Sequence, residues 1–367
     1  MEEWWDDGRV IAWRKLSNKK LLCTARSNWL SLSTTFFNKK SCHQITIDLH
    51  EVIFLDKENL TVTVEPNVTV RDICKYLIPK GYALAVTLEV GDATLGGLAF
   101  GVGMTTHSHK VGLYQETIIS YEVVTASGDV VTVTAQNEHA DLFYCLPWSH
   151  GTLAFLVALK LKIIRVKPYV KITYIPCHSQ EEYCNRMMKL SGALDKDHCV
   201  PDFLEATIFT RDKAVILAGN FEEVDTWEKW FRPDQKLNYL KVFQDIVMPL
   251  STLKEQVNTS ERLFNIYPLL VYPCRVYDHQ RGHQGQLRPP PCNLLVPGTN
   301  YAMFNDLGVY GIPGFVRRKE PYIPTYSMRA MEKFTREVGG YSFLYADLFM
   351  TEDEFNKMFD MTLYEKV

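Results

Sequence analysis

A run of small residues from Thr94 to Thr106 carries the strongest chemical signal in the chain. Glycines stand at positions 96, 97, 101 and 103. Because glycine has no Cβ, a backbone rich in it can approach a ligand closely and adopt positive φ angles. Successive backbone N–H groups in such a loop form a concavity that suits the oxygens of a pyrophosphate. The run therefore predicts a loop that binds a nucleotide cofactor.

The whole glycine run is expected to line the cofactor: Thr94, Leu95, Gly96, Gly97, Leu98, Ala99, Phe100, Gly101, Val102, Gly103, Met104, Thr105 and Thr106. The stretch from Gly101 to Thr106 reads G-x-G-x-x-T, so it lacks the third glycine of the dinucleotide-binding fingerprint. No clear strand precedes it, and no ribose-binding acid follows at the required distance. A Rossmann site is therefore rejected, while a glycine-rich hairpin without a ligand remains the alternative.

Two further segments could face the same cofactor. His109 and Lys110 follow the glycine run, and imidazole and ammonium groups can act electrostatically on a flavin or an oxyanion. Gly151 and Thr152 lie in a second turn of small residues, which leads into an apolar strand. We expect all four residues to contact the cofactor. The alternative for the second turn is that it only starts the strand.

The composition limits the class of protein. At 367 residues the chain exceeds the size at which single hydrophobic cores stop growing, so two domains are expected. A net charge of −3 gives no basic footprint for nucleic acid. Nine cysteines without C-x-x-C spacing favour reduced thiols facing the cytosol, and no metal site is expected. We expect neither a secretory signal nor a membrane-spanning segment.

The first part of the chain is rich in strands. A helix is expected over residues 70–80, with Thr69 as N-cap and Gly81 at its end. Alternating or continuous apolar residues predict strands at 21–23, 45–49, 60–66, 121–125, 130–133 and 156–166. Few helices accompany these strands, which favours an α+β fold over a doubly wound parallel sheet.

The pattern changes after Lys167-Pro168, where we place a domain boundary. Two capping boxes, Ser179 with Glu182 and Thr351 with Glu354, predict the starts of helices. The expected elements are helices at 179–194, 328–338 and 351–361 and strands at 203–209, 214–219 and 343–347. The sequence thus divides into domains at 1–167 and 168–367.

Several motifs in order give the chain a resemblance to the delta24-sterol reductases, the Diminuto-type flavoproteins. The glycine run alone indicates only the wider p-cresol methylhydroxylase-type (PCMH/VAO-type) FAD-binding fold, and the late motifs narrow it to the sterol branch. The matching motifs are Leu22-Cys23-Thr24-Ala25-Arg26, the glycine run, residues 108–113, 141–144 and 147–153, Asp306-Leu307-Gly308-Val309-Tyr310-Gly311, Leu344-Tyr345-Ala346-Asp347 and residues 354–360.

The resemblance implies an FAD-binding domain of two subdomains at 1–167. A substrate-binding cap domain with an antiparallel sheet would follow at 168–367. It implies FAD and NADPH as cofactors, and reduction of the delta24 side-chain double bond of a sterol. An isolated alkene accepts hydride poorly, so the site needs a well-placed acid in a dry pocket. The candidates for this acid by motif context are Tyr310, Tyr345, Asp347 and Asp306.

Many relatives of the wider fold attach FAD through a histidine in the first phosphate loop. Residues 24–28 contain no histidine here, so FAD is expected to bind without a covalent bond. Arg26 in this loop could pair with a phosphate through its planar guanidinium. The family also implies an endoplasmic reticulum membrane location, with a membrane surface as a partner, although a cytosolic or peripheral protein is the alternative for this chain.

The sequence also departs from the family pattern. Set against the family pattern, we expect this chain to lack the N-terminal hydrophobic anchor, a central segment between residues 232 and 242 and part of the C-terminal tail. Ala25 and Ala154 stand where relatives favour glycine. Two alternatives therefore remain open. One is another FAD oxidoreductase of this fold, such as an alcohol or lactone oxidase, and the other is a non-catalytic paralogue that acts as a binding protein.

Overall fold

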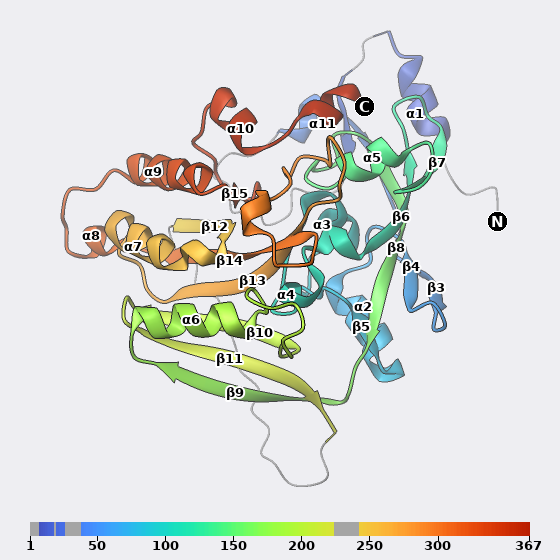
Figure 1. The fold of residues 1–367 in the computed structure, drawn as a ribbon. Helices are drawn as coiled ribbons and strands as arrows, with labels where there is room; N and C mark the ends of the chain where they lie inside the picture. The colour runs from blue at the N-terminus through green and yellow to red at the C-terminus, as the bar shows by residue number, and fades with distance from the viewer. Residues whose placement is uncertain (1–6, 18–19, 26–37, 224–241) are drawn as a thin grey trace.

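The computed structural model describes residues 7–17, 20–25, 38–223 and 242–367. Within these ranges the chain forms two large antiparallel sheets and one small parallel pair, with helices packed around them (Figure 1). The small pair joins β1 (Leu22–Thr24) to β2 (His43–Ile45). This mixture of helices with mainly antiparallel sheets confirms the expected α+β class.

The first sheet runs in the order β3-β4-β8-β6-β7, with β5 added beside β8. Its strands are β3 (Val52–Asp56), β4 (Thr61–Val64), β5 (Tyr82–Leu84), β6 (Ile118–Val124), β7 (Val130–Thr134) and β8 (Phe155–Arg165). Its helices are α1 (Asp7–Arg14), α2 (Val70–Leu77), α3 (Leu95–Gly101), α4 (Ser108–Val111) and α5 (Ala140–Cys145), with short 3-10 turns at Lys39–Ser41, Ile78–Lys80 and Tyr114–Thr117.

The second sheet runs in the order β15-β12-β14-β13-β10-β11-β9. Its strands are β9 (Tyr169–Cys177), β10 (Phe203–Thr210), β11 (Lys213–Glu222), β12 (Val242–Pro249), β13 (Leu269–Tyr277), β14 (Tyr301–Gly311) and β15 (Tyr341–Ser342). Its helices are α6 (Gln180–Leu190), α7 (Leu253–Leu263), α8 (Gly314–Arg317), α9 (Pro324–Glu337), α10 (Glu352–Met358) and α11 (Thr362–Lys366), with 3-10 turns at Leu250–Thr252 and Cys292–Leu294.

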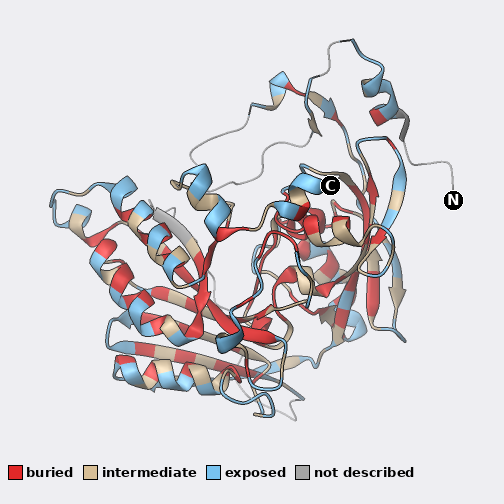
Figure 2. Ribbon diagram, turned by 45° about the horizontal axis from the view of Figure 1, so that its top comes forward, coloured by how far each residue is buried: buried red, intermediate tan, exposed pale blue. Residues whose placement is uncertain are grey.

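The two faces of the second sheet have different partners. Alternate residues of β14, such as Leu307 and Val309, pack with α6, α7 and α9 in one large apolar core. Phe304, which has the opposite parity on β14, packs instead with Trp148 and Val102 of the first half. Buried residues follow most strands of both sheets, whereas β9 is largely exposed, and exposed residues lie on the outward sides of the helices (Figure 2). The second face of this sheet is therefore the one that meets the first half.

Most local expectations are confirmed. Thr69 caps α2, and Gly81 ends the following turn with a φ of 84°. Strands β6 and β7 pair as the expected hairpin, and β10 pairs with β11. The Thr351 and Glu354 capping box forms at the start of α10.

Four local expectations need correction. The glycine run is not a loop throughout, because Leu95, Leu98 and Ala99 bury one side of helix α3. The strand expected at 45–49 lies earlier, at His43–Ile45. The strand expected at 343–347 ends at Ser342, and the ring of Phe343 stacks on Trp148.

The fourth correction concerns the cap of α6. The hydroxyl of Ser179 accepts a hydrogen bond from the Glu182 N–H as expected. The Glu182 carboxylate, however, accepts from the N–H of His178, so the reciprocal bond of a capping box is replaced by one from the preceding residue.

Candidate functional site

The glycine run begins at a capped helix. The hydroxyl of Thr94 accepts a hydrogen bond from the Gly97 N–H at 3.3 Å. A Cβ on Gly96 would lie 2.6 Å from the Cβ of Pro66, and one on Gly103 would lie 2.7 Å from a methyl group of Leu88. These two glycines are explained by packing inside the protein.

The other two glycines offer backbone to a ligand. Gly97 is exposed, and Gly101, one helical turn later, is partly exposed. A Cβ on Gly101 would come no closer than 3.7 Å to any atom, the nearest being in the ring of His150. The remaining residues of α3 are buried. The side of α3 that carries Gly97 and Gly101 is thus where a cofactor could approach.

The second small-residue turn lies beside this side of α3. The N–H of His150 donates to the Phe100 carbonyl at 3.1 Å, which fixes the turn against the end of the helix. His150, Gly151 and Thr152 are all exposed. The structure therefore brings together Gly97, Gly101, His150, Gly151 and Thr152, which we call the glycine strip.

Three of the seven non-glycine residues with positive φ in the described part of the chain lie in the glycine strip or within two residues of it. Val102, Trp148 and His150 have φ angles of 63°, 69° and 50°. Positive φ is unfavourable for a β-branched or bulky residue. Such residues persist only where the surrounding structure holds them, and they gather at functional sites. The strain therefore marks the strip as a candidate binding site.

His109 and Lys110 lie elsewhere, at the contact between the two halves. His109 is fully buried, and its Nε2 lies 2.8 Å from the Pro201 carbonyl while its Nδ1 lies 3.1 Å from the Thr106 carbonyl. Burial lowers the pKa of His109 to about 4, so the ring is neutral near pH 7. Lys110 forms an ion pair with Asp202 at 2.7 Å. These contacts join the start of β10 to the first half, and the expected cofactor role of both residues stays a prediction.

The first phosphate loop is only partly described. Arg26 lies outside the described residues. In the described part of this region, the Lys39 ammonium donates to the Thr24 carbonyl at 3.1 Å and lies 3.3 Å from its hydroxyl. A basic side chain thus stands beside the residues that precede Arg26.

A cluster of acids lies on the second face of the second sheet. Strand pairing sets Asp245 of β12 opposite Gly308 of β14, and Asp306 of β14 opposite Tyr272 of β13. Residues paired in this way share a face of the sheet. Electrostatic contacts connect Glu205 of β10 and Glu89 of the first half to the same group. We call these residues the acid cluster: Glu89, Glu205, Asp245, Tyr272, Asp306 and Tyr310.

The Tyr310 side chain reaches Asp245 across the space beside Gly308 on β14. Its phenolic hydroxyl donates a hydrogen bond to Oδ1 of Asp245. A Cβ on Gly308 would lie 2.8 Å from the Tyr310 ring, so the ring occupies the space that any other residue at 308 would need. The D-x-G-x-Y spacing of Asp306, Gly308 and Tyr310 places all three on one face, because side chains alternate along a strand.

The acid cluster favours protonated carboxyl groups. Burial raises the pKa of Asp245, and this outweighs the opposing hydrogen bond from Tyr310, while the charge of Glu89 raises it further. Burial and the neighbouring Asp245 and Glu89 raise the pKa of Asp306 well above its usual range. Burial of the carboxyl group raises the pKa of Glu89, although the residue as a whole is exposed, and burial also raises the pKa of Glu205. Carboxyl groups that share a site cannot all ionise at low energetic cost. The cluster therefore holds protons near neutral pH.

The other two acid candidates lie apart from this group. Tyr345 and Asp347 belong to the segment between β15 and α10 and are partly buried. The Tyr345 ring lies 6.1 Å from that of Phe343, in the apolar cluster that includes Trp148. Of the four candidates, Asp306 and Tyr310 come together, while Tyr345 packs towards the segment that carries the second turn.

Sequence reasoning missed Asp245, Glu89, Glu205 and Tyr272. A signal for Asp245 was present, since it is the one charged residue within the apolar strand Val242–Pro249. Its pairing with β14 joins residues far apart in the chain, and no periodic pattern reveals such a pairing. Among the residues that the structure describes, no group of three or more His, Cys, Asp or Glu side chains could hold a metal ion.

Comparison with known proteins agrees with these features. Residues 10–134 match the FAD binding domain family. The chain is 29% identical over 455 aligned positions to the "Delta(24)-sterol reductase homolog" of Caenorhabditis elegans, covering 100% of this chain and 82% of that protein. Along essentially its whole length, this chain is similar to delta(24)-sterol reductases.

Other members of the group give the same result. The human delta(24)-sterol reductase is 29% identical over 440 positions, covering 98% of this chain and 81% of that protein. The Arabidopsis thaliana protein is 28% identical, covering 96% and 79%. The 455 positions aligned with the nematode homologue exceed the 367 residues of this chain, so the alignment places gaps in it. The expected resemblance and the FAD-binding α+β fold are thereby confirmed.

Proposed function

We propose that this protein is an FAD-dependent reductase that uses NADPH to reduce the delta24 side-chain double bond of a sterol. The observation that carries the proposal is the similarity to delta(24)-sterol reductases along essentially the whole chain, together with the match of residues 10–134 to an FAD binding domain. We assign residues 1–167 to the FAD-binding domain and 168–367 to the cap that binds the substrate.

The glycine strip is the proposed contact for FAD. Its exposed backbone at Gly97 and Gly151 leaves room for a ligand where a larger side chain would intrude. Thr152 adds a hydroxyl, which Tyr364 holds at 2.6 Å. Because residues 24–28 contain no histidine, we propose that FAD is bound without a covalent bond. Arg26 is proposed to contact a phosphate of FAD.

Apolar side chains on the second sheet support a sterol as substrate. Ile172 and Tyr174 of β9 are 47% and 63% exposed. They share a face with Leu217 of β11, which is partly exposed. This face continues across the sheet to the acid cluster. A rigid hydrocarbon ring system could rest on it and present its side chain to the acids.

A sterol substrate also suggests where the protein acts. We propose that it works at the surface of the endoplasmic reticulum membrane, from which a sterol can enter the cap. In the parts of the chain that the structure describes, no helix is both long enough and apolar enough to cross a bilayer.

The proposed reaction needs one hydride and one proton. A reduced flavin, when bound, supplies the hydride. The chain must orient the double bond, exclude water and deliver a proton to the second carbon. The acid cluster is suited to the last task, because burial and neighbouring acids raise the pKa of Asp245 to about 7 and hold the pKa of Asp306 well above its usual range.

The test is a spectrum of the purified protein followed by two half-reactions. We expect a flavin absorbance band that acid releases as free FAD, bleaching by NADPH without oxygen, and recovery of the band when a delta24-unsaturated sterol is added, with the saturated sterol as product. Bleaching by an alcohol or lactone would instead favour an oxidase. A folded, colourless protein that does not bind added FAD would contradict the proposal and favour a non-catalytic paralogue.

A further inference from the structure

We propose that Asp245 is the residue that protonates the substrate, with Tyr310 and Glu89 as positioning residues that set its proton affinity. This inference rests on the proposed sterol reduction. Asp245 lies outside the motifs that the sequence indicated, and each neighbouring group has a distinct and measurable effect on it.

The hydrogen bond between Tyr310 and Asp245 determines which carboxyl oxygen can carry the proton. The Tyr310 hydroxyl donates to Oδ1 of Asp245, so a proton carried by this carboxyl group must reside on the other oxygen, Oδ2. Asp245 is only partly buried, in contrast to the strand residues that follow it. An acid whose proton-bearing oxygen is determined by a neighbouring hydrogen bond meets one geometric need of a general acid.

Gly308 makes this arrangement possible. It lies opposite Asp245 in the strand pairing, and the Tyr310 ring fills the space beside it. A methyl group at 308 would come within 2.8 Å of a ring carbon of Tyr310. The ring would have to move, and the hydrogen bond to Asp245 would lengthen or break.

Asp306 gives independent support for a protonated site. Its side chain is 4% exposed, and its Oδ1 has no hydrogen-bond partner among the described residues. Its carboxyl group interacts electrostatically with Asp245, on the adjacent strand, and with Glu89. A buried carboxylate with an unpaired oxygen is costly, and two such groups side by side cannot both ionise easily. The pair of Asp245 and Asp306 therefore retains at least one proton near pH 7.

The reaction balances with this donor. The two π electrons of the double bond form the new C–H bond to the proton from Oδ2, and Asp245 becomes a carboxylate. The other carbon receives the hydride supplied by the reduced flavin. Asp245 then regains a proton that comes ultimately from solvent, so the site returns to its starting state.

Removing Tyr310 or Glu89 should change the pKa of Asp245 in opposite directions. The Tyr310 hydrogen bond stabilises the carboxylate, whereas the charge of Glu89 disfavours it. Tyr310→Phe should therefore raise the pKa of Asp245, and Glu89→Gln should lower it. The other titratable members of the cluster, Glu205, Tyr272 and Asp306, remain unchanged in both variants.

The first experiment measures sterol turnover against pH in the FAD-loaded protein. For Asp245→Asn we expect flavin binding and bleaching by NADPH to be kept, and sterol reduction to fall roughly 100-fold or more. The alkaline limb of the pH profile should move up by about one unit in Tyr310→Phe and down by a similar amount in Glu89→Gln. If Tyr310 and Glu89 had only structural roles, the two substitutions would not shift the alkaline limb in opposite directions.

Control variants separate these effects from general damage. Asp212→Asn changes an exposed carboxyl group in the turn between β10 and β11. Tyr301→Phe removes a hydroxyl from β14 on the face that packs against the helices. Both should keep the wild-type profile. Near-wild-type turnover by Asp245→Asn, or unchanged limbs in both positioning variants, would overturn the inference.

A second readout does not depend on activity. Infrared spectra of the protein without cofactor should show a protonated carboxyl band near pH 7 that weakens in Asp245→Asn and Asp306→Asn but not in Asp212→Asn. If the band did not weaken in Asp245→Asn and Asp306→Asn, the proposed protonated pair would be refuted even if the enzyme were active. If wild type shows the band but never reduces a sterol, the proposed function fails while the protonated pair stands.

Discussion

A substitution at Gly97 tests the predicted cofactor contact most directly. It is the accessible glycine on α3, and a Cβ there meets only the Thr94 hydroxyl at 3.0 Å. Gly97→Val should leave the fold intact but fill the space where the cofactor would approach. We expect FAD affinity to fall at least about tenfold, which corresponds to about 1.4 kcal/mol. Flavin fluorescence titration measures the change.

A matched glycine provides the control for this prediction. A Cβ on Gly282 would meet no atom within 4 Å, and the φ angle of this glycine is not positive. Gly282→Val should keep both FAD affinity and the unfolding midpoint. If Gly97→Val retained stoichiometric flavin, the glycine strip would not be the binding site, whatever the overall activity.

At the scale of single residues, the sequence predicted part of the site for sound reasons. The density of small residues between Thr94 and Thr106 revealed the glycine segment. It did not reveal that Gly96 and Gly103 serve packing against Pro66 and Leu88, because those contacts depend on distant parts of the chain. Asp306 and Tyr310 were found from a motif, but their partner Asp245 required the pairing of β12 with β14.

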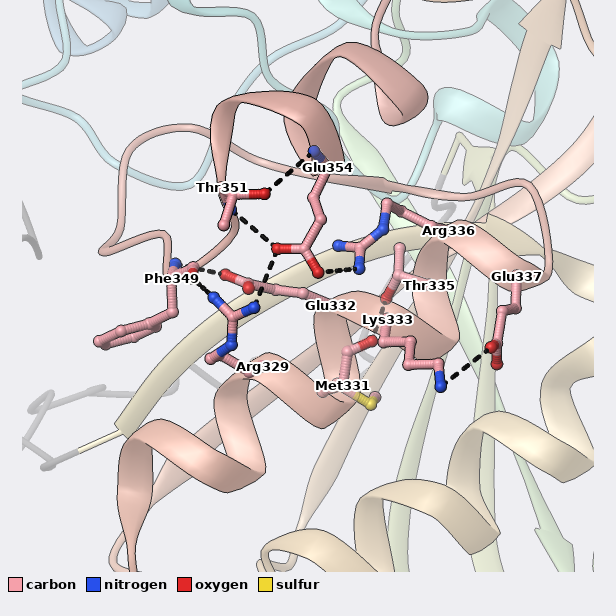
Figure 3. Close-up of polar contacts among 10 residues, drawn as sticks. All are labelled: Arg329, Met331, Glu332, Lys333, Thr335, Arg336, Glu337, Phe349, Thr351 and Glu354. Atoms are coloured by element: carbon pink, nitrogen blue, oxygen red, sulfur yellow. Dashed lines mark hydrogen bonds and ion pairs between the residues drawn. The ribbon is translucent and has the colours of Figure 1, made fainter.

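At the scale of elements, the start of α10 carries a network that tests how much a helix cap stabilises the fold (Figure 3). Glu354 accepts hydrogen bonds from the Thr351 N–H at 2.8 Å, from Arg329 at 3.1 Å and from Arg336 at 2.9 Å. These bonds connect α10 to α9. Glu332 adds a bond from the Phe349 N–H at 2.7 Å, which fixes the segment that precedes the cap.

We expect Glu354→Ala to lower the free energy of unfolding by roughly 1–3 kcal/mol, because it removes a cap and the carboxylate that accepts from both Arg329 and Arg336. Chemical denaturation measures the loss. The control is Glu337→Ala, which breaks a 3.7 Å pair with Lys333 on the exposed side of α9 and should cost about 0.5 kcal/mol or less. Equal losses in the two variants would show that the network adds nothing beyond a surface ion pair.

Helix caps and hairpins were predictable where neighbouring residues in the sequence determine them. Caps at Thr69 and Thr351 and the β6–β7 hairpin follow from residues next to one another. The strand expected at 343–347 was wrong because Phe343 turns into an aromatic cluster with Trp148. Local alternation could not reveal that this ring would find a partner about two hundred residues earlier in the chain.

At the scale of the whole molecule, function depends on how the two halves are held together. The contacts that join them link residues about ninety positions apart, such as His109 with Pro201 and Lys110 with Asp202. Sequence patterns suggested a cofactor role for these residues because they follow the glycine run. The structure shows a connection between the halves, which no periodicity in one segment can indicate.

The ion pair between Lys110 and Asp202 should contribute stability in a pH-dependent way. Burial alone would raise the pKa of Asp202, but hydrogen bonds from Lys110 and the Phe221 N–H outweigh it and hold the pKa below its usual value. The pair therefore stabilises the fold above about pH 4, the ordinary aspartate pKa, and this contribution is lost as the pH falls through the lower folded-state pKa.

Lys110→Met tests this connection. We expect the variant to lose about 1–2 kcal/mol of unfolding free energy at pH 7, since a partly buried, charge-assisted bond is removed, and the difference from wild type to shrink as the pH falls below about 4. Arg71→Met, which breaks an exposed pair with Asp92, should change stability by about 0.5 kcal/mol or less. A loss in Lys110→Met that stayed constant down to acid pH would mean that packing of the side chain, and not its charge, joins the two halves.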